Sequence, residues 1–384
     1  NGYAIYKIYV TINEIFKFLF YHNQHIMERF MTLARNKFAQ VMPKFAAIAI
    51  AALAVGCSQP TQTISQAPAD TSNTSTEKIP KTIAITAIVE HPSLDDIRLG
   101  VVDGLASLGY KDGENLTVNF QSAQGNMATV GQIAKQFVAD TPDAIVAITT
   151  PSAQSLAAAT TSIPLIYTAV SDPVAAKLLN NNHQATQPNI TGLSSQLPIE
   201  PQVELFQKIK PEAKRIGFVF SPGEANSVAV KNKLIEILPK YGMTLVEVPA
   251  NRSSDVGDAT RSLVGKVDLL YTSLDNGVAS AMEAMVLAAN ELQIPVITSD
   301  EFSVRRGATA ALGVNDYDFG LTTAKLVAQV LDGKSPNEIK PEVMNTLTLF
   351  ISPKHAANQG VTVDLTTLGE SINVDTTPAR QPNK

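Results

Sequence analysis

Two stretches of the chain, residues 143–173 and residues 268–301, decide the fold. The first reads DAIVAITTPSAQSLAAATTSIPLIYTAVSDP and the second reads DLLYTSLDNGVASAMEAMVLAANELQIPVITSDE. Each contains a short apolar run, a polar loop, an alanine-rich segment, an apolar run led by Ile-Pro, and then Ser-Asp. A strand, a helix and a second strand in this order predict a parallel βαβ unit. Because the order occurs twice, we predict two similar lobes.

The same alternation extends outward from both stretches. Apolar runs that predict strands are 81–89, 116–121, 143–149, 163–170, 215–221, 244–250, 268–273, 294–299, 308–313 and 347–351. Segments with apolar residues at helical spacing are 94–108, 127–139, 152–160, 200–209, 225–240, 277–291, 317–332 and 353–359. Open parallel sheets bind ligands at the carboxyl ends of their strands, beside helix N-termini. Two facing lobes therefore predict an α/β protein with a binding cleft.

The composition is that of a globular protein. The chain has 384 residues, of which 45% are hydrophobic and 17% charged, and this excludes a disordered or fibrous chain. Its single cysteine excludes a disulfide framework and a cysteine-based zinc site. Residues 1–56 hold six Lys/Arg and two Asp/Glu, so the remainder holds 24 basic and 33 acidic residues, a net charge of −9. This acidic body argues against nucleic acid as a partner.

The N-terminal region is predicted to be an export and anchoring segment. Residues 45–55, FAAIAIAALAV, are too few to span a bilayer but are typical of the apolar part of a signal peptide. The run ends Ala-Val-Gly-Cys at Cys57, which resembles a bacterial lipobox, so we predict that Cys57 is lipidated. Residues 27–56 are then the lipoprotein signal peptide, and the protein is anchored in the cell envelope by its lipid.

Two further segments flank this signal peptide. Residues 57–78 are rich in Ser, Thr, Gln, Ala and Pro, which predicts a flexible tether. Residues 1–26 precede the first methionine, and we interpret them as translated upstream sequence outside the fold. The alternative for this region is an amphipathic or membrane segment at residues 3–21.

Eight stretches in series resemble a known family. They are ITAIVEHPSLDDIRLGVVDGL, FQSAQGN, AITTPSAQ, YTAVSDPVAAKL, NITGLSSQLP, SPGEANS, SLDNGV and GATAALGVNDYDFG. Together, from about residue 81 to residue 362, they look like the ABC-transporter substrate-binding family associated with tryptophan and tyrosine uptake. Ala87 departs from the pattern, since relatives often have Gln there.

The resemblance implies a type I periplasmic-binding-protein fold, in which a three-crossing hinge joins two lobes that are each a parallel-sheet αβα sandwich. Lobe 1 is expected at residues 79–193 plus about 317–343, and lobe 2 at residues 194–316 plus about 344–384. The hinge crossings are expected near residues 190–197, 313–318 and 341–347. The implied function is capture of an amino acid, often aromatic, by a monomer without cofactors that delivers it to an ABC permease.

Two alternatives remain open. The same fold can bind a nucleoside, a sugar or a peptide. The chain can also be a surface-anchored α/β enzyme, because fold alone does not decide function. Against an enzyme, the sequence lacks the G-x-S-x-G, H-E-x-x-H and G-x-x-x-x-G-K-[ST] motifs.

An amino-acid ligand needs an anion site for its α-carboxylate. Helix N-termini offer unpaired N–H groups and the positive end of the helix dipole. Loops 149–154, 225–227 and 274–276 lie where such helices are predicted to begin, although simple helix capping is the alternative. The candidate ligand-binding residues in or near these loops are Thr150, Ser152, Ala153, Ser171, Asn226, Ser227 and Asn276.

The α-ammonium needs carboxylates. We rank the candidates Asp275, Glu224, Asp300 and Glu90, with capping as the alternative role of Asp275. Asp172 precedes a proline, and shaping that turn is its alternative role. Other candidates for ligand contact are His91, which precedes Pro92, and the aromatic residues Tyr167, Tyr271 and Phe220, for which a place in the core is the alternative.

Overall fold

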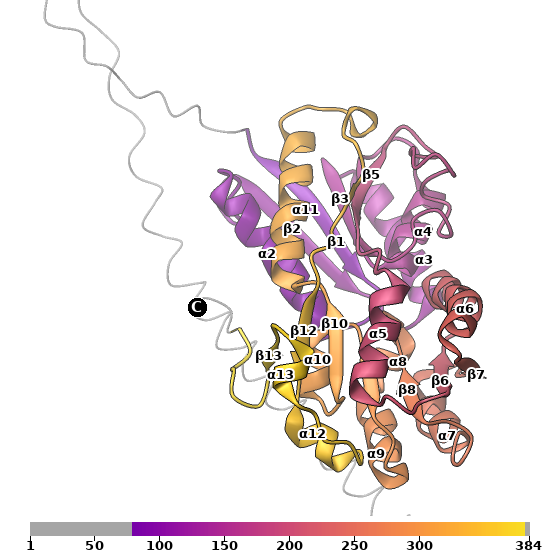
Figure 1. Cartoon of the computed structure of the whole chain (residues 1–384). Coiled ribbons are helices and arrows are strands. Elements are labelled where there is room, and N and C mark those ends of the chain that lie inside the picture. The colour runs from indigo at the N-terminus through magenta and orange to yellow at the C-terminus, as the bar shows by residue number, and fades with distance from the viewer. Residues whose placement is uncertain (1–78, 381–384) are drawn as a thin grey trace, which may run out of the picture. The chain divides into compact units, whose positions relative to one another are not determined.

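A computed structural model describes residues 79–380, shown in Figure 1. The signal peptide, Cys57 and the tether predicted from the sequence lie outside these residues. No helix within residues 79–380 is long and apolar enough to cross a membrane.

Two sheets organise the described part of the chain. The first has the order β11 (Glu342–Val343), β5 (Ile190–Ser194), β4 (Leu165–Val170), β3 (Ala144–Ile148), β1 (Lys81–Ala87) and β2 (Leu116–Ser122). The second has the order β13 (Ile372–Asn373), β12 (Thr348–Ile351), β10 (Ala310–Gly313), β9 (Val296–Thr298), β8 (Leu269–Tyr271), β6 (Arg215–Phe220) and β7 (Thr244–Pro249). The five strands that come first along the chain in each sheet are β1–β5 and β6–β10. They lie in equivalent orders, β5-β4-β3-β1-β2 and β10-β9-β8-β6-β7, which confirms the predicted repeat. We call the first sheet and its helices lobe 1, and the second lobe 2.

Helices cover both faces of each sheet. In lobe 1 one face carries α2 (Pro92–Ser107) and α11 (Asp316–Leu331), and the other carries α3 (Met127–Asp140) and α4 (Thr150–Ala159). In lobe 2 one face carries α5 (Ile199–Ile209) and α6 (Ala225–Ile237), and the other carries α7 (Val256–Arg261), α8 (Asn276–Ser280) and α9 (Met282–Leu292). The remaining short helices are α10 (Glu301–Arg305), α12 (Pro353–Asn358), α13 (Leu365–Leu368), η2 (Leu238–Tyr241), η3 (Ser253–Asp255) and η4 (Pro336–Glu338).

Some elements differ from the sequence predictions. The helix predicted at 225–240 ends at Ile237 and continues as a 3₁₀ turn, because Pro239 has no N–H to donate. The helix predicted at 277–291 is two helices separated by Ala281. The lobe 2 sheet is not wholly parallel, since β12 pairs antiparallel with β10. The short elements α7, α10, α13, β11 and β13 were not predicted, because so few residues show no clear periodicity.

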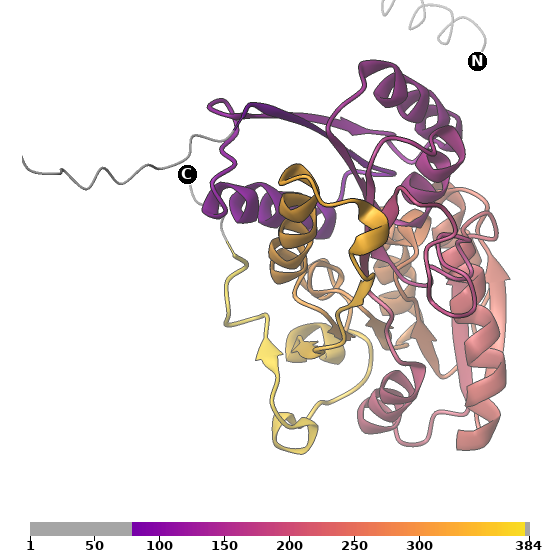
Figure 2. The same cartoon turned by 90° about the horizontal axis from the view of Figure 1, so that it is seen from above.

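The chain passes between the two sheets three times. These passages follow β5, β10 and β11, at residues 195–198, 314–315 and 344–347. The second passage brings α11 onto the lobe 1 sheet beside α2, although α11 follows a strand of lobe 2. Figure 1 and Figure 2 show the two helices side by side in both views.

Two glycines allow this close helix pair. A Cβ on Gly100 of α2 would lie 2.3 Å from the carbonyl oxygen of Tyr317, and a Cβ on Gly320 of α11 would lie 2.2 Å from that of Ile97. Either distance is far inside van der Waals contact, so only glycine lets the backbones approach this closely. The crossing brings the N-terminal ends of α2 and α11 together at the carboxyl edge of the lobe 1 sheet.

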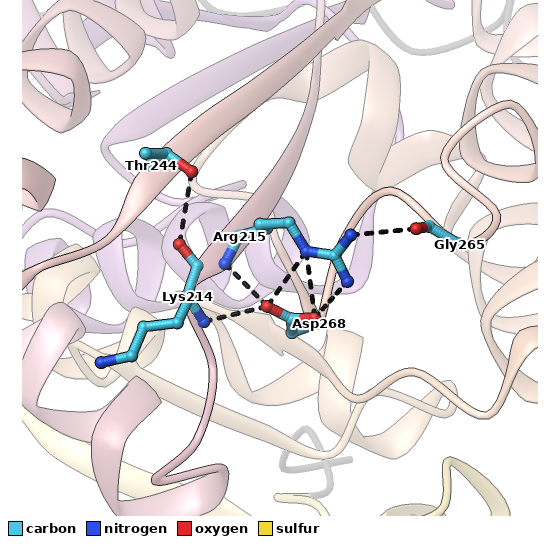
Figure 3. Close-up of polar contacts among 5 residues, drawn as sticks. All are labelled: Lys214, Arg215, Thr244, Gly265 and Asp268. Atoms are coloured by element: carbon cyan, nitrogen blue, oxygen red, sulfur yellow. Dashed lines mark hydrogen bonds and ion pairs between the residues drawn. The ribbon is translucent and has the colours of Figure 1, made fainter.

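In each lobe, an aspartate at the amino end of one strand accepts hydrogen bonds from the amino end of the neighbouring strand. In lobe 2, Asp268 accepts hydrogen bonds from the backbone N–H groups of Lys214 and Arg215 at 2.9 and 2.8 Å, and from the Arg215 guanidinium (Figure 3). In lobe 1, Asp143 accepts from Thr82 N at 2.8 Å and Lys81 Nζ at 2.9 Å. These ties lie at the edge of each sheet opposite the candidate site.

Candidate functional site

The carboxyl ends of the strands of both lobes line one cavity. The space between its walls, including the opening to solvent, is about 680 Å³. Contacts between the lobes flank it. Ser93 Oγ donates to Asp300 Oδ1 at 3.4 Å, and Lys233 Nζ lies 3.1 Å from Asp172 Oδ2. The cavity therefore lies between the lobes, with walls from both of them, rather than within one lobe.

Lobe 1 presents an open helix N-terminus to the cavity. Thr149, the N-cap of α4, has φ 80° and ψ 159°, a strained conformation for a residue with a Cβ, and its side chain does not cap the helix. The buried hydroxyls of Thr149 and Ser152 have no hydrogen-bond partner among residues 79–380. A helix N-terminus without a capping side chain, next to unpaired hydroxyls, is suited to an anion.

His91 supplies a neutral hydrogen-bond donor on the same side. It is the N-cap of α2, and its Nδ1 accepts from Ser93 N at 3.3 Å. The ring proton is therefore assigned to Nε2, which is buried and has no partner in the described part of the chain. Burial lowers the pKa of His91, against the opposing effect of Asp300, so the ring is neutral near pH 7.

Two carboxylates, Asp300 and Asp316, line the cavity where α10 and α11 begin. Asp300 accepts from Ser303 N at 2.8 Å and Ser303 Oγ at 2.6 Å. Burial, followed by the nearby charge of Asp300, raises the pKa of Asp316 well above its ordinary value. Among residues 79–380, no lysine or arginine lines this cavity. The acid pair therefore lacks a cation within the cavity.

Asp275 also lines the cavity, but its hydrogen bonds come from its own lobe. Its Oδ1 accepts from Ser221 Oγ at 2.7 Å and Val278 N at 2.9 Å. Its Oδ2 accepts from Ser221 N at 2.6 Å and from Ser227 Oγ. Four donors fill the acceptor capacity of a carboxylate. Asp275 thus caps α8 and joins two loops of lobe 2.

Glu224 adds further hydrogen bonds between the same two loops of lobe 2. Its carboxylate accepts from Gly277 N at 3.0 Å, Asn276 N at 3.2 Å and Asn276 Nδ2 at 2.6 Å. Burial and the nearby charge of Asp275 raise the pKa of Glu224 to about 7. The N-terminus of α8 is therefore already occupied by two of the protein's own carboxylates, Asp275 and Glu224.

The structure places the predicted site residues in three groups. Those that line the cavity are Thr150, Ser171, Asn226, Asp275, Asn276 and Asp300. Ser152, Ala153, Glu224 and Ser227 lie behind them in the adjoining helix turns and loops, and Glu90 is exposed and bonded to Gln124 Nε2 outside the cavity.

The aromatic candidates lie elsewhere. Tyr167 and Tyr271 are fully buried in the cores of lobes 1 and 2, and Phe220 packs in the lobe 2 core. Among residues 79–380, Phe319 on α11 is the one Phe, Tyr or Trp side chain that lines the cavity. From the sequence, Asp316 and Asp318 flank Tyr317 near a predicted hinge, and helix capping was the role favoured for them over ligand contact. Asn315 takes the capping role and accepts from Asp318 N, which leaves the Asp316 side chain to face the cavity.

Comparisons with known proteins agree with the two-lobed α/β fold. The family model of ABC transporter substrate binding proteins matches residues 82–374. The chain is 39% identical over 297 residues to the tyrosine-binding protein of Clostridioides difficile (strain R20291), covering 77% of this chain and 85% of that protein.

Solved structures agree as well. A conserved domain protein from Vibrio cholerae O1 biovar eltor has 43% identity and a TM-score of 0.74, with 76% of this chain and 99% of that chain covered. An ABC domain from Streptococcus pneumoniae in complex with L-Trp has 32% identity and a TM-score of 0.73, with 76% and 98% covered. Such proteins act outside the cytoplasm and pass a small molecule to an ABC permease. By family match, identity and fold, this chain belongs to the ABC transporter substrate-binding protein family.

Proposed function

We propose that this protein captures a free aromatic amino acid, tyrosine or tryptophan, between its lobes and delivers it to its permease. The observation that carries the proposal is the acid pair Asp300 and Asp316, which meets no basic side chain among the described residues that line the cavity. Two adjacent carboxylates without a counter-ion favour a ligand that brings its own cation.

The α-ammonium of the ligand binds at this acid pair. Asp316 lies close enough to Asp300 for that charge to raise its pKa, and an ammonium between them removes the repulsion. Hydrogen bonds between charged partners are about twice as strong as neutral ones. Asp275, ranked first from the sequence, contributes less in this proposal, because four donors of lobe 2 already occupy its oxygens.

The α-carboxylate binds at the N-terminus of α4. The Thr149 hydroxyl and His91 Nε2 are buried donors that lack partners within residues 79–380. The helix dipole adds positive potential at the same place. A zwitterion therefore binds with its carboxylate on lobe 1 and its ammonium at Asp300 of lobe 2 and Asp316 at the start of α11.

The ligand side chain has an apolar wall to pack against. Leu94 and Ile97 of α2, Val314 and Phe319 at the α11 end, and Leu274 of lobe 2 all line the cavity. Burying an aromatic ring against such a wall is strongly favourable. Tyrosine and tryptophan are the ligands named for two relatives, the tyrosine-binding protein and the L-Trp complex.

A matched ligand series tests the proposal. Tyrosine and tryptophan are titrated into the purified protein by calorimetry, alongside tyramine, which lacks the carboxylate, and N-acetyltyrosine, which lacks the ammonium. We expect binding of at least one intact amino acid and at least a tenfold loss for each truncated form. If tyramine binds as tightly as tyrosine, the proposed carboxylate site is wrong. If N-acetyltyrosine binds as tightly as tyrosine, the proposed ammonium site is wrong.

We also propose that Cys57 carries a lipid anchor. Its place after an apolar run, with a tether before the folded part, supports this assignment. Cys57→Ala should release the protein from membranes of the producing bacterium while ligand affinity stays unchanged. Retention of the variant in the membrane fraction would contradict the assignment.

A further inference from the structure

Asn226 offers the cavity an unused hydrogen-bond acceptor. The side chain lies in the first turn of α6, is 3% exposed and lines the cavity. Its Nδ2 donates to the carbonyl oxygen of Leu274 at 2.8 Å and to Glu224 Oε2 at 3.1 Å. Its Oδ1 has no partner among residues 79–380. A buried acceptor left unpaired is costly, so the position favours a ligand group that donates a hydrogen bond.

The orientation of this amide is fixed by its neighbours. Rotating the amide by 180° would place Oδ1 against the carbonyl oxygen of Leu274, which cannot donate. It would also place Oδ1 against the carboxyl group of Glu224 and lose both existing hydrogen bonds. Asn226 therefore presents only an acceptor to the cavity, and a ligand without a donor at this place leaves it unsatisfied.

The strand order separates Asn226 from the acid pair. Asp300 follows β9, and Asn226 lies in the helix that follows β6, with β8 between these two strands. Neighbouring strands lie about 4.8 Å apart, so two spacings amount to roughly 10 Å. This is on the order of the length of an aromatic amino acid from its ammonium to the far edge of its ring. With the ammonium at the acid pair, the group that meets Asn226 belongs to the ligand side chain.

We infer that Asn226 Oδ1 accepts a hydrogen bond from the aromatic ring of the ligand, from a phenol O–H or an indole N–H, and so selects against phenylalanine. This inference rests on the proposed function and adds the group that sets specificity. An apolar pocket alone distinguishes phenylalanine from tyrosine only weakly, whereas a buried polar partner penalises the analogue that lacks the donor.

The test compares ligands that differ only in this donor. The pairs are tyrosine with phenylalanine, and tryptophan with 3-(benzothiophen-3-yl)alanine, in which sulfur replaces the indole N–H. We expect the donor-bearing member of the better-binding pair to bind roughly ten- to a hundredfold more tightly to the wild-type protein. In Asn226→Leu this ratio should fall to about one, because both members lose the amide and neither leaves an acceptor unpaired.

Asn232→Leu is the matched control, because Asn232 is an exposed asparagine of the same helix, and it should keep the wild-type ratio. Equal binding of both members of each pair to the wild-type protein would overturn the inference, and this measurement does not depend on how the variant folds. A ratio that persists in Asn226→Leu would overturn it as well. Failure of every amino acid to bind would instead refute the proposed function itself.

Discussion

The two lobes have the same strand order, but they present opposite chemistry to the cavity. The helix after the first strand of lobe 1 begins at His91, a neutral imidazole, whereas its counterpart in lobe 2 begins at Glu224. The helix after β3 begins at Thr149, which does not cap it, whereas the helix after β8 is capped by Asp275. The clearest difference is therefore between α4 and α8: the N-terminus of α4 has no capping side chain, whereas Asp275 and Glu224 both accept hydrogen bonds at the N-terminus of α8.

A third pair of equivalent positions, Asp172 in lobe 1 and Asp300 in lobe 2, also differs between the lobes. Asp172 follows β4 and lies 3.1 Å from Lys233 of lobe 2, so its charge is neutralised within the protein. Asp300 follows β9 and faces Asp316 and Ser93 instead. The equivalent positions of the two lobes thus differ in charge where they meet the cavity, and the proposed orientation of the ligand depends on this difference.

Giving lobe 1 the cap of lobe 2 should have the largest effect. In Thr149→Asp, a carboxylate caps α4 as Asp275 caps α8, and it repels the ligand carboxylate in a buried site. We expect affinity for tyrosine or tryptophan to fall by roughly a hundredfold or more, while the melting temperature of the unliganded protein is kept. Thr149→Asn, a neutral cap of the same shape, should lose less than tenfold. Equal losses in both variants would show that shape, not charge, matters there.

Neutralising the cation site should have the next largest effect. Asp316→Asn removes a charge that contacts the ammonium, so affinity should fall roughly ten- to a hundredfold. Because the folded-state pKa of Asp316 is raised, its ionised form destabilises the fold as pH rises from the ordinary carboxyl range through that pKa. The variant should therefore be at least as stable as the wild type at pH 7 without ligand. Weaker binding with lower stability would indicate a purely structural role.

Asp275 ranked first from the sequence as the contact for the ligand ammonium, with helix capping as its alternative role. Asp275→Asn distinguishes these two roles. A ligand contact predicts a ten- to hundredfold loss of affinity with an unchanged melting temperature. The four hydrogen bonds of its carboxylate predict instead a loss of about 2–3 kcal/mol in the free energy of unfolding, because an amide cannot accept from all four donors. Denaturant unfolding and calorimetry on the same sample decide between these outcomes.

Glu224 should make stability depend on pH. Its folded-state pKa of about 7 lies above its ordinary value, so the fold is most stable below the ordinary pKa and loses stability as pH rises through 7. Between pH 5 and pH 8 we expect a loss on the order of 1–2 kcal/mol that is missing in Glu224→Gln. Identical pH profiles for the two proteins would mean that Glu224 is ionised throughout. Asp316→Asn and Asp96→Asn, measured in parallel, account for two other carboxyl groups whose pKa is raised by burial.

Local periodicity was enough to predict most strands and helices and the repeat that relates the lobes. The polar loops were also found, since six predicted residues line the cavity. Asp316 was missed because its position depends on α11 crossing from lobe 2 to pack on α2, a contact that Gly100 and Gly320 permit. The saturation of Asp275 depends on Ser221 and Ser227, about fifty residues away, and no local pattern shows such hydrogen bonds.

The smallest expected effect concerns the aspartates at the opposite edge of the two sheets. Asp268 and Asp143 both accept backbone hydrogen bonds from a neighbouring strand. Asp268 also accepts hydrogen bonds from the guanidinium of Arg215, whereas Asp143 accepts one from the ammonium of Lys81. The Arg215 hydrogen bonds lower the pKa of Asp268 to about 2, so its contribution is present above the ordinary pKa and is lost as pH falls toward 2.

We therefore expect Asp268→Asn to lower the free energy of unfolding by about 1 kcal/mol at pH 7, and Asp143→Asn to lower it by less. A planar guanidinium makes several hydrogen bonds in one fixed orientation, whereas an ammonium on a flexible stem makes one and is well solvated when free. Denaturant unfolding of both variants at pH 7 measures the difference. If the two losses are equal, the backbone hydrogen bonds that the lobes share account for the whole effect, and the two lobes differ in chemistry only where they face the ligand.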